Sequence, residues 1–426
     1  MLAQRGYDKV EFDQPADVYV INTCSVTENA DKECRQIIRK IKRQSPQAKV
    51  AVVGCYAQLQ PEQIAAIPGV NLVLGTAEKF NIASHLESLS PANTDAEIHA
   101  TAIDAVDFYV EAHSFGDRTR TFLKVQDGCD YGCSFCTIPL ARGKSRSAEI
   151  ADILEQAKRI AESGVKEVVL TGVNIGDFGK GSAGGRKTED FLALIRTLDD
   201  VEGIGRFRIS SIEPNLLNEE IIRFVAESKK FAPHFHIPLQ SGSDKILKLM
   251  RRRYLRELYA ARVEMIKSII PHCCIGVDVI VGFPGETHDD FIETYKFLNE
   301  LDISYLHVFA YSERPNTLAI EMKDSVSMDE RKLRSKMLRS LSVKKRRFFY
   351  EQHLGENRPV LFESENDNGF ISGFTDNYIK VKFPFASNLI NQVEKITLGN
   401  ITPDGDVEGL MFEENSTVTF KLQTSN

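Results

Sequence analysis

Three cysteines stand close together in the segment GCDYGCSFC, residues 128–136, with the spacing Cys-x3-Cys-x2-Cys. Thiolates are the ligands of iron–sulfur clusters, so Cys129, Cys133 and Cys136 can bind three irons of one 4Fe–4S cubane. A structural zinc site needs a fourth Cys or His, and none follows before residue 230. The spacing therefore predicts a cluster with one iron left open for a substrate or cofactor. Three buried or zinc-bound cysteines are the alternative.

The elements that must position these cysteines form a repeated unit between about residues 118 and 345. Strand-like runs with a helical pattern after them recur six times, at 121–126, 167–172, 207–211, 234–240, 275–283 and 305–311. In parallel β/α barrels the loops at the carboxyl ends of the strands form the active face. Six units are too few for an eight-fold barrel. We therefore expect an α/β fold built on a partial, open (β/α)6 barrel, 118–348, with the cysteines after its first strand.

The regions on either side of this barrel have different patterns. Residues 1–86 alternate short β-branched runs (18–22, 50–54 and 71–75) with an amphipathic stretch at 30–44, which predicts a parallel α/β domain. The polar residues 87–117 are expected to be a linker. Residues 349–415 consist of strand-like pieces with Gly and Asn turns, which is typical of a small antiparallel β-barrel of about five strands. Residues 416–426 form a tail.

Composition excludes several classes of protein. The chain of 426 residues is 42% hydrophobic and 27% charged, which is ordinary for a soluble globular protein. It has neither an apolar run of the roughly 20 residues that cross a bilayer nor a secretory signal, so we expect no membrane contact and a cytoplasmic location. The net charge of −7 argues against a uniformly basic nucleic-acid binder. Positive charge is concentrated at 331–347, where nine Lys and Arg occur without an acid.

The cysteine motif resembles the defining motif of the radical S-adenosylmethionine (SAM) superfamily. The resemblance implies that the open iron binds the amino and carboxylate groups of SAM, which an electron from the cluster then cleaves to methionine and a 5′-deoxyadenosyl radical. It also implies that Phe135 lies near the adenine. Further SAM contacts are implied at the ends of later strands: Gly172 and Asn174 at the methionine amino group, Ser210, Ser211 and Glu213 at the ribose, and the polar or tightly turned Gln240, Ser241 and Gly282. Taken singly, such Gly-rich strand ends are ordinary turns.

Two further cysteines follow strands of the first region, in Asn22-Thr23-Cys24 and Gly54-Cys55-Tyr56. This region resembles the amino-terminal domain of the methylthiotransferases, in which three cysteines hold an auxiliary 4Fe–4S cluster, and Cys24 and Cys55 match the second and third of them. The first cysteine and its strand are absent, so we expect this domain to be truncated and the chain to bind about four irons tightly, not eight. Cys34 lies within the predicted helix, and Cys273 and Cys274 precede a strand, so these three are expected to be packing residues.

Nearly the whole chain resembles the methylthiotransferases, and most of all the branch that acts on N6-threonylcarbamoyladenosine at position 37 of tRNA. The segments that carry this resemblance include QDGCDYGCSFCTIPLARGKSRS, HIPLQSGSD, DVIVGFPGE and YLHVFAYSERP. The implied reaction places a methylthio group on C2 of the adenine. Three alternatives remain open: methylthiolation of isopentenyladenosine 37, methylthiolation of a ribosomal protein aspartate, and a non-catalytic iron–sulfur protein that binds RNA.

The last 75 residues resemble the TRAM domain, a small β-barrel of tRNA-modifying enzymes. This barrel is acidic here, with twelve acids and five bases in residues 351–426. Because phosphate contacts need Lys or Arg, we expect tRNA to contact the basic helix through Lys344, Lys345, Arg346 and Arg347, aided by Arg251, Arg252 and Arg253. An ordinary solvated helix face is the alternative. The resemblance also implies a flavodoxin- or ferredoxin-like electron donor and a sulfur donor.

Overall fold

The amino-terminal region is a parallel α/β domain. The structure, a computed structural model, describes residues 2–24, 28–89, 95–106, 108–114, 119–182 and 185–411. Helix α1 (Glu28–Gln44) places Cys34, Ile38 and Ile41 on one buried face against the sheet, because residues three or four apart share a side of a helix. The four parallel strands lie in chain order: β1 (Val18–Thr23), β2 (Lys49–Gly54), β3 (Leu72–Leu74) and β4 (Glu97–His99).

Strand β4 corrects one expectation, because it lies in the stretch 87–117 that was expected to be a linker. Its residues pair in register with β3, Leu72 opposite Glu97. The sequence pattern of β4 is weak because the strand is only three residues long and lies half-exposed on the edge of the sheet. Residues 112–114 of the same stretch run antiparallel to the next strand of the chain.

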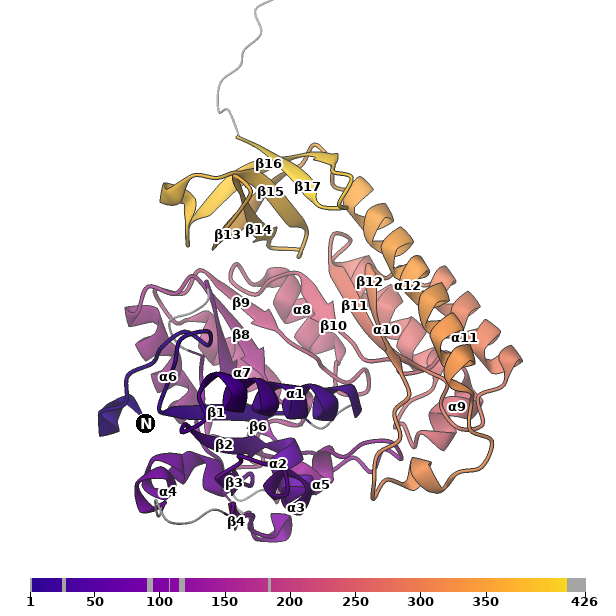
Figure 1. Cartoon of the computed structure of the whole chain (residues 1–426). Helices are drawn as coiled ribbons and strands as arrows, with labels where there is room; N and C mark the ends of the chain where they lie inside the picture. Colours follow the sequence, from indigo (N-terminus) through magenta and orange to yellow (C-terminus); the bar gives the residue numbers. More distant parts are fainter. Residues whose placement is uncertain are drawn as a thin grey trace, which may run out of the picture.

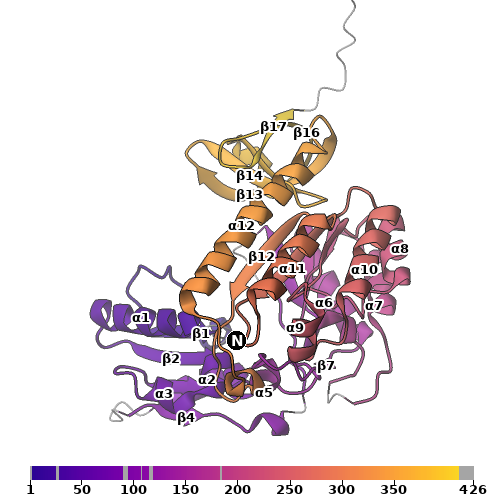
Figure 2. The same ribbon diagram turned by 90° about the vertical axis from the view of Figure 1, so that its right-hand side faces the viewer.

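The central region contains the six predicted strands, all parallel and in chain order. They form two three-stranded sheets, joined by isolated bridges such as Ser211 to His236. Helices cover the outer face and leave the barrel open on one side (Figures 1 and 2). The strands are β5 (Arg120–Lys124), β8 (Glu167–Thr171), β9 (Arg206–Ile209), β10 (His234–His236), β11 (Cys274–Val281) and β12 (Tyr305–Ala310). The main covering helices are α6 (Ile150–Glu162), α7 (Phe191–Asp199), α8 (Glu219–Glu227), α9 (Asp244–Leu249), α10 (Arg256–Ile269) and α11 (His288–Glu300).

Side chains alternate between the helices and the interior of this partial barrel, as the pleat of a strand requires. In β11, Ile275, Val277 and Val279 pack in the core beneath the helices. The residues between them, Gly276 and Asp278 among them, therefore face the interior. The interior face of β11 consequently carries the charged Asp278 as well as Gly276 and Ile280, whereas its outer face is apolar.

Helix α12 (Met328–Glu351) lies along the outer edge of β12 and connects the partial barrel to the carboxyl-terminal region (Figure 2). The Ser342 hydroxyl lies 2.8 Å from the backbone nitrogen of Leu306 and 3.0 Å from its oxygen. The helix therefore satisfies backbone groups that a further strand would otherwise pair.

The carboxyl-terminal region is a closed five-stranded barrel around an apolar core that includes Val360, Phe362 and Ile396. It differs from the expected antiparallel barrel in one pairing, because β15 runs parallel to β17. In Figure 1 this barrel (yellow) lies at the end of the central region opposite the amino-terminal domain. Its strands are β13 (Asn357–Asp367), β14 (Phe370–Thr375), β15 (Lys380–Pro384), β16 (Val393–Ile401) and β17 (Val407–Met411).

The carboxyl-terminal barrel covers the amino ends of the partial-barrel strands. Arg206, at the start of β9, donates to the backbone oxygens of Pro359 and Phe374, and Arg208 donates to those of Thr375 and Asp376. The fully buried carboxylate of Glu167 pairs with both guanidinium groups at 3.0 Å. Both guanidinium groups at this end therefore share one buried carboxylate and direct further N–H groups to backbone oxygens.

Candidate active site

The three clustered cysteines lie in a loop that leaves the carboxyl end of the first barrel strand. Two short antiparallel strands, β6 (Gln126–Asp127) and β7 (Arg146–Ser147), hold the base of the loop together. Gly128 has a φ of +69°, and a Cβ at this position would lie 1.9 Å from the backbone oxygen of Lys144. Only glycine fits there, because any side chain would separate the two ends of the loop.

Each of the three cysteine sulfurs accepts one hydrogen bond. The backbone N–H groups of Tyr131 and Ile138 lie 3.4 Å from the sulfurs of Cys129 and Cys136, and a guanidinium nitrogen of Arg252 lies 3.2 Å from that of Cys133. Burial raises the pKa of Cys129 to about 12 and that of Cys136 to about 11. The thiols are therefore neutral on their own, and a bound metal is what would hold them as thiolates.

The spread of the sulfur atoms favours a cluster over a single ion. A tetrahedral zinc with bonds of about 2.3 Å would bring its ligands to about 3.8 Å from one another. Among the described residues, one set of His, Cys, Asp or Glu has its ligand atoms within 4.8 Å of one another, and it contains none of the cysteines. Thiolates on three different irons of a cubane lie further apart than ligands of one ion. The donor set and its spread thus fit a 4Fe–4S cluster.

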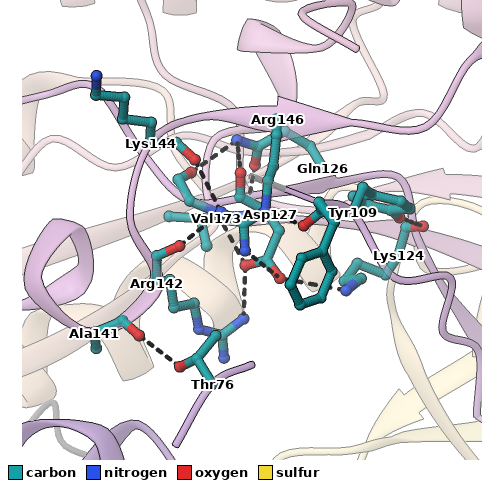
Figure 3. A network of polar contacts seen from close by, with 12 residues as sticks. Thr76, Tyr109, Lys124, Gln126, Asp127, Ala141, Arg142, Lys144, Arg146 and Val173 are labelled. Carbon is teal, nitrogen blue, oxygen red and sulfur yellow. Dashed lines mark hydrogen bonds and ion pairs between the residues drawn. The ribbon is translucent and has the colours of Figure 1, made fainter. Parts of the chain in front are cut away.

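A buried glutamine joins the cysteine loop to the next strand end (Figure 3). The Gln126 side-chain nitrogen donates to the backbone oxygens of Asp127 and Gly128 and to the Ser145 hydroxyl. Its oxygen accepts the backbone N–H groups of Val173 and Asn174 at 2.9 and 2.7 Å. One side chain therefore fixes the loop relative to the carboxyl end of β8.

A charged network lies beside this glutamine, between the amino-terminal domain and the cysteine loop (Figure 3). The Asp127 carboxylate contacts Lys124, Arg142 and Arg146 at 3.2 to 3.8 Å. Burial alone would raise the pKa of Asp127, but the surrounding Lys and Arg side chains lower it to about 2. Asp127 is therefore ionised at every physiological pH and holds three cations against one another.

Several residues implied as SAM contacts do lie around the cysteines. A cavity of about 230 Å³ is lined by Cys136, Phe135 and Gln240, together with apolar residues of β11 and β12. Asn174 is buried, and neither polar atom of its side chain makes a hydrogen bond of ordinary geometry, although its amide approaches the Tyr131 hydroxyl. Such an unsatisfied amide fits a polar ligand, as SAM would supply.

The other predicted SAM contacts lie at strand ends, and one of them has a strained backbone. Gln240 has a φ of +69°, a conformation that is costly for a residue with a side chain and that is often found at binding sites. Gly172 lies against Gln126, and a Cβ there would come within 3.0 Å of its backbone oxygen. Ser210 and Ser211 are partly exposed just beyond the end of β9. These residues can all reach a ligand above the strand ends.

Other predicted contacts have different partners in the structure. The Ser241 hydroxyl is buried against Thr294 and the backbone of Ser243 and so supports helix packing. Gly282 has a φ of +74° and donates its N–H to the Glu286 carboxylate, and a Cβ there would lie 2.3 Å from Arg331. Both residues shape the turns around the site and do not face the cavity beside the cysteines.

Arg252 corrects the expected group of RNA contacts. Its side chain is 4% exposed and pairs with Glu213, which was expected at the SAM ribose. Because the same guanidinium contacts Cys133, it stabilises the cysteine loop and does not reach an RNA surface. Arg251 and Arg253 are accessible, and Arg253 stacks over the Tyr131 ring.

Cys24 and Cys55 lie side by side at the carboxyl ends of β1 and β2, because Thr23 and Gly54 pair in register. Helix α2 (Cys55–Leu59) packs on α5 (Ile138–Arg142), which follows Cys136 directly. The Arg142 side chain extends from α5 to within 3.4 Å of the Cys55 sulfur. The two predicted cysteine sites therefore face the same junction between domains.

The other three cysteines are buried in the core, as expected for packing residues. Cys34 lies beneath α1 in the core of the amino-terminal domain. Cys273 belongs to the core of the partial barrel, and Cys274 packs against the core of the carboxyl-terminal barrel. None of them lies at the carboxyl end of a strand.

Sequence reasoning did not identify Gln126, Asp127 and Arg142 as site residues. Their side chains contact the loop and the strand ends without belonging to a recognisable motif. The position of Gln126 and Asp127 between a strand and the first cysteine was the one available signal. Arg142 acts across a domain boundary, which no local pattern encodes.

Comparison with known proteins places these observations in a family. Residues 123–298 match the radical SAM superfamily, and residues 1–75 match uncharacterized protein family UPF0004. The threonylcarbamoyladenosine tRNA methylthiotransferases MtaB of Bacillus subtilis and Aquifex aeolicus are both 40% identical to this chain. The first alignment covers 93% of this chain and 89% of the relative, and the second covers 89% and 90%. A tRNA-2-methylthio-N(6)-dimethylallyladenosine synthase of Desulfitobacterium hafniense is 30% identical over 93% of this chain and 89% of its own length.

The fold has a counterpart among solved structures. A radical S-adenosylmethionine methyltransferase from Kitasatospora setae, with cobalamin and a 4Fe–4S cluster bound, aligns with a TM-score of 0.53 and 16% identity. The alignment covers 72% of this chain and 66% of that chain, just under two thirds. With the conserved architecture and the sequence identity over almost its whole length, this chain belongs to the threonylcarbamoyladenosine tRNA methylthiotransferase family of radical SAM enzymes.

Proposed function

We propose that this enzyme places a methylthio group on C2 of N6-threonylcarbamoyladenosine at position 37 of tRNA. The observation that carries the proposal is the Cys129, Cys133 and Cys136 loop beside a cavity, in a chain 40% identical to relatives named for this substrate. The chain covers 89% of the length of the first of these relatives.

In this proposal Cys129, Cys133 and Cys136 hold a 4Fe–4S cluster. The amide of Asn174 hydrogen-bonds the polar groups of SAM, and Phe135 and Gln240 line the space beside it. Bound together, the cluster and SAM supply the radical chemistry for which the superfamily is named. Arg252 and Gln126 do not touch the reacting atoms and act as positioning residues for the cysteine loop.

We also propose that Cys24 and Cys55 are ligands of an auxiliary 4Fe–4S cluster. Two thiolates hold it less tightly than three hold the first cluster, so about four irons remain tightly bound and the second cluster forms when iron and sulfide are in excess during reconstitution. Their adjacent positions at the ends of β1 and β2 support this, because two thiolates there can bind neighbouring irons. The contact between Cys55 and Arg142 supports placing such a cluster next to the cysteine loop. A sulfur source at this junction would lie close to the substrate cavity, where the methylthio group has to form.

The carboxyl-terminal barrel is, in this proposal, a TRAM domain that binds RNA together with α12. Lys344, Arg346 and Arg347 are exposed on that helix, although Arg347 pairs with Glu351. Lys345 instead donates to the backbone oxygens of Asn299 and Leu301 at the end of α11. The expected phosphate contacts therefore reduce to Lys344 and Arg346, together with the accessible Arg251 and Arg253.

We further propose that the enzyme works in the cytoplasm. The family resemblance supports a flavodoxin- or ferredoxin-like electron donor and a sulfur donor as its partners. No helix in the part of the chain that the structure describes is both long and apolar enough to span a bilayer.

The proposed activity can be tested by mass spectrometry of tRNA nucleosides. Anaerobically reconstituted enzyme with dithionite and SAM should add a methylthio group to tRNA that carries threonylcarbamoyladenosine. The Cys129→Ala variant should add none, because one iron then has no thiolate. Methylthiolation of dimethylallyladenosine in place of threonylcarbamoyladenosine would contradict the proposed substrate. No methylthiolation of either tRNA would contradict the proposed reaction.

A further inference from the structure

A polar group on the interior wall of the partial barrel has no role in the site described so far. Asp278 of β11 lies opposite His307 of β12, and His236 is on the neighbouring strand β10. One carboxylate oxygen of Asp278 is 2.8 Å from the His236 Nε2 and 3.4 Å from the His307 Nδ1. Among the described residues these three form the set whose ligand atoms lie within 4.8 Å of one another.

The group is held in one arrangement. Tyr305 extends across Gly276, where a Cβ would lie 2.3 Å from its hydroxyl, and that hydroxyl lies 3.4 Å from the His236 Nδ1. Burial alone would raise the pKa of Asp278, but hydrogen bonds from both histidines lower it well below its usual range. Asp278 is thus an ionised acceptor, and His307, whose side chain is 55% exposed, presents its free edge to the interior.

This group separates two cavities. Asp278 is the one Asp, Glu, Lys or Arg that lines the cavity of about 230 Å³ beside Cys136. His307 lines a second cavity of about 250 Å³ between β12, α12 and the carboxyl-terminal barrel, together with Arg346 and Lys380. A ligand that reached from the first cavity past Asp278 would therefore meet a histidine and then Arg346.

The proposed reaction indicates which part of the substrate would lie near Asp278 and His307. If C2 of an adenine faces the cysteines, the N6 substituent leaves the ring at C6, which is separated from C2 by N1, and it projects obliquely to one side of them. Relatives of this chain are named for different substituents at that nitrogen, threonylcarbamoyl in one group and dimethylallyl in another. The first offers N–H donors, a hydroxyl and a carboxylate, whereas the second is wholly apolar.

We propose that Asp278, His307 and His236 recognise the N6 substituent of the substrate adenosine. Asp278 accepts hydrogen bonds from the carbamoyl N–H groups. His307, whose Nδ1–H goes to Asp278, donates Nε2–H to the threonyl hydroxyl or carboxylate when both of its ring nitrogens carry protons. His236 is a positioning residue that orients Asp278. Arg346 places positive charge beyond the histidine, where the anionic end of the substituent lies, whereas the Lys380 ammonium is already paired with Asp406 at 2.9 Å. This recognition site deepens the proposed function and rests on it.

A site built to hydrogen-bond its substrate rejects an apolar analogue, because its own polar groups are then buried without partners. The enzyme should therefore discriminate strongly against dimethylallyladenosine. Discrimination should depend on His307 and Asp278 more than on the RNA that surrounds the modified base.

The test uses chemically synthesised anticodon stem-loops of one sequence, each with a single variable adenosine. The adenosine carries threonylcarbamoyl, the methyl ester of that group, or dimethylallyl. Reconstituted wild-type enzyme is compared with His307→Leu, with Asp278→Asn, and with the control His288→Leu, which changes an exposed histidine at the start of α11. The kcat/KM for methylthiolation is measured for each RNA, and iron content and melting temperature verify that each variant is folded.

We expect His307→Leu to lower kcat/KM for the threonylcarbamoyl stem-loop by roughly ten- to a hundredfold and to remove the preference for the free acid over its methyl ester. Asp278→Asn should lower discrimination against dimethylallyl, and His288→Leu should match the wild type. Unchanged discrimination in both site variants would overturn the recognition site. So would a zinc or manganese ion present in the wild type but missing from Asp278→Asn, because the group would then be a metal site. A wild type inactive on the threonylcarbamoyl stem-loop and on full-length tRNA would instead refute the proposed function.

Discussion

The two ends of the partial barrel differ in how far their buried polar groups have partners within the protein. At the amino ends of the strands, Glu167 pairs with both Arg206 and Arg208, and backbone oxygens of the carboxyl-terminal barrel accept further N–H groups from both. At the carboxyl ends, three thiols are kept neutral by burial, and the Asn174 amide lacks well-formed partners. The guanidinium and carboxylate groups at the amino ends thus have partners within the protein, whereas the thiols and the amide at the carboxyl ends are suited to bind ligands.

This difference separates stability from activity within one fold. A buried ion pair costs stability chiefly when one partner is removed, since the other charge is then left uncompensated. An unsatisfied polar group at a binding site costs stability until its ligand arrives. We call the amino ends of the strands the closed end and their carboxyl ends the open end. Substitutions at the closed end should therefore lower the free energy of unfolding, and substitutions at the open end should affect SAM chemistry.

The largest effect is expected at the open end. Replacing Cys129, Cys133 and Cys136 together by Ala should abolish formation of 5′-deoxyadenosine from SAM under dithionite, because no cluster can then be held. Chromatography of the reaction products measures this. The control Cys34→Ala, which removes a thiol from the core beneath α1, should retain cleavage. Cleavage by the triple variant would refute the assignment of the cluster.

At the closed end, Glu167→Gln should lower the free energy of unfolding by about 3–5 kcal/mol, because two buried guanidinium groups lose their counter-charge. Urea denaturation measures the change. The matched control Glu155→Gln, in an exposed pair with Lys158, should leave the unfolding midpoint where it is. Equal midpoints for the two variants would show that the closed end does not depend on this carboxylate.

Acid should weaken the closed end in a defined range. Burial alone would raise the pKa of Glu167, but Arg208 and Arg206 lower it to about 2 from the ordinary 4.5. A lowered pKa means that the ion pairs stabilise the fold fully above about pH 4.5 and lose that contribution as the pH falls toward 2. Urea midpoints at pH 6, 4 and 3 should therefore fall more steeply for the wild type than for Glu167→Gln. Parallel curves would contradict this.

The smallest effect is expected for a single hydrogen-bonding group at the open end. Asn174→Ala should raise the KM for SAM about tenfold, the cost of roughly one hydrogen bond. The melting temperature should not fall, since the amide has no well-formed partner to lose. Initial rates at varied SAM concentration measure the KM, and Asn299→Ala, on the exposed face of α11, is the control. A lower melting temperature with an unchanged KM would make Asn174 structural.

The sequence predicted the strands better than the interactions between them. All six barrel strands and the five of the carboxyl-terminal barrel are confirmed, because β-branched runs between turn residues are local signals. Strand β4 was missed because three half-exposed edge residues carry little pattern. Arg252 was assigned to RNA because a run of three arginines gives no indication which one is buried. Gln126 was missed because its partners lie about 20 and 47 residues away.

Helix α12 also affects whether the edges of the open barrel can pair with other molecules in solution. An incomplete barrel has two free strand edges, and exposed edges invite pairing with other chains. Ser342 of α12 occupies the backbone groups of Leu306 on one edge, and Ala112 and Ser114 pair with Lys124 and Phe122 on the other. Among the described residues, neither cover is part of a longer strand that a second molecule could extend. The barrel can therefore remain open to a bulky substrate without joining edge to edge into aggregates.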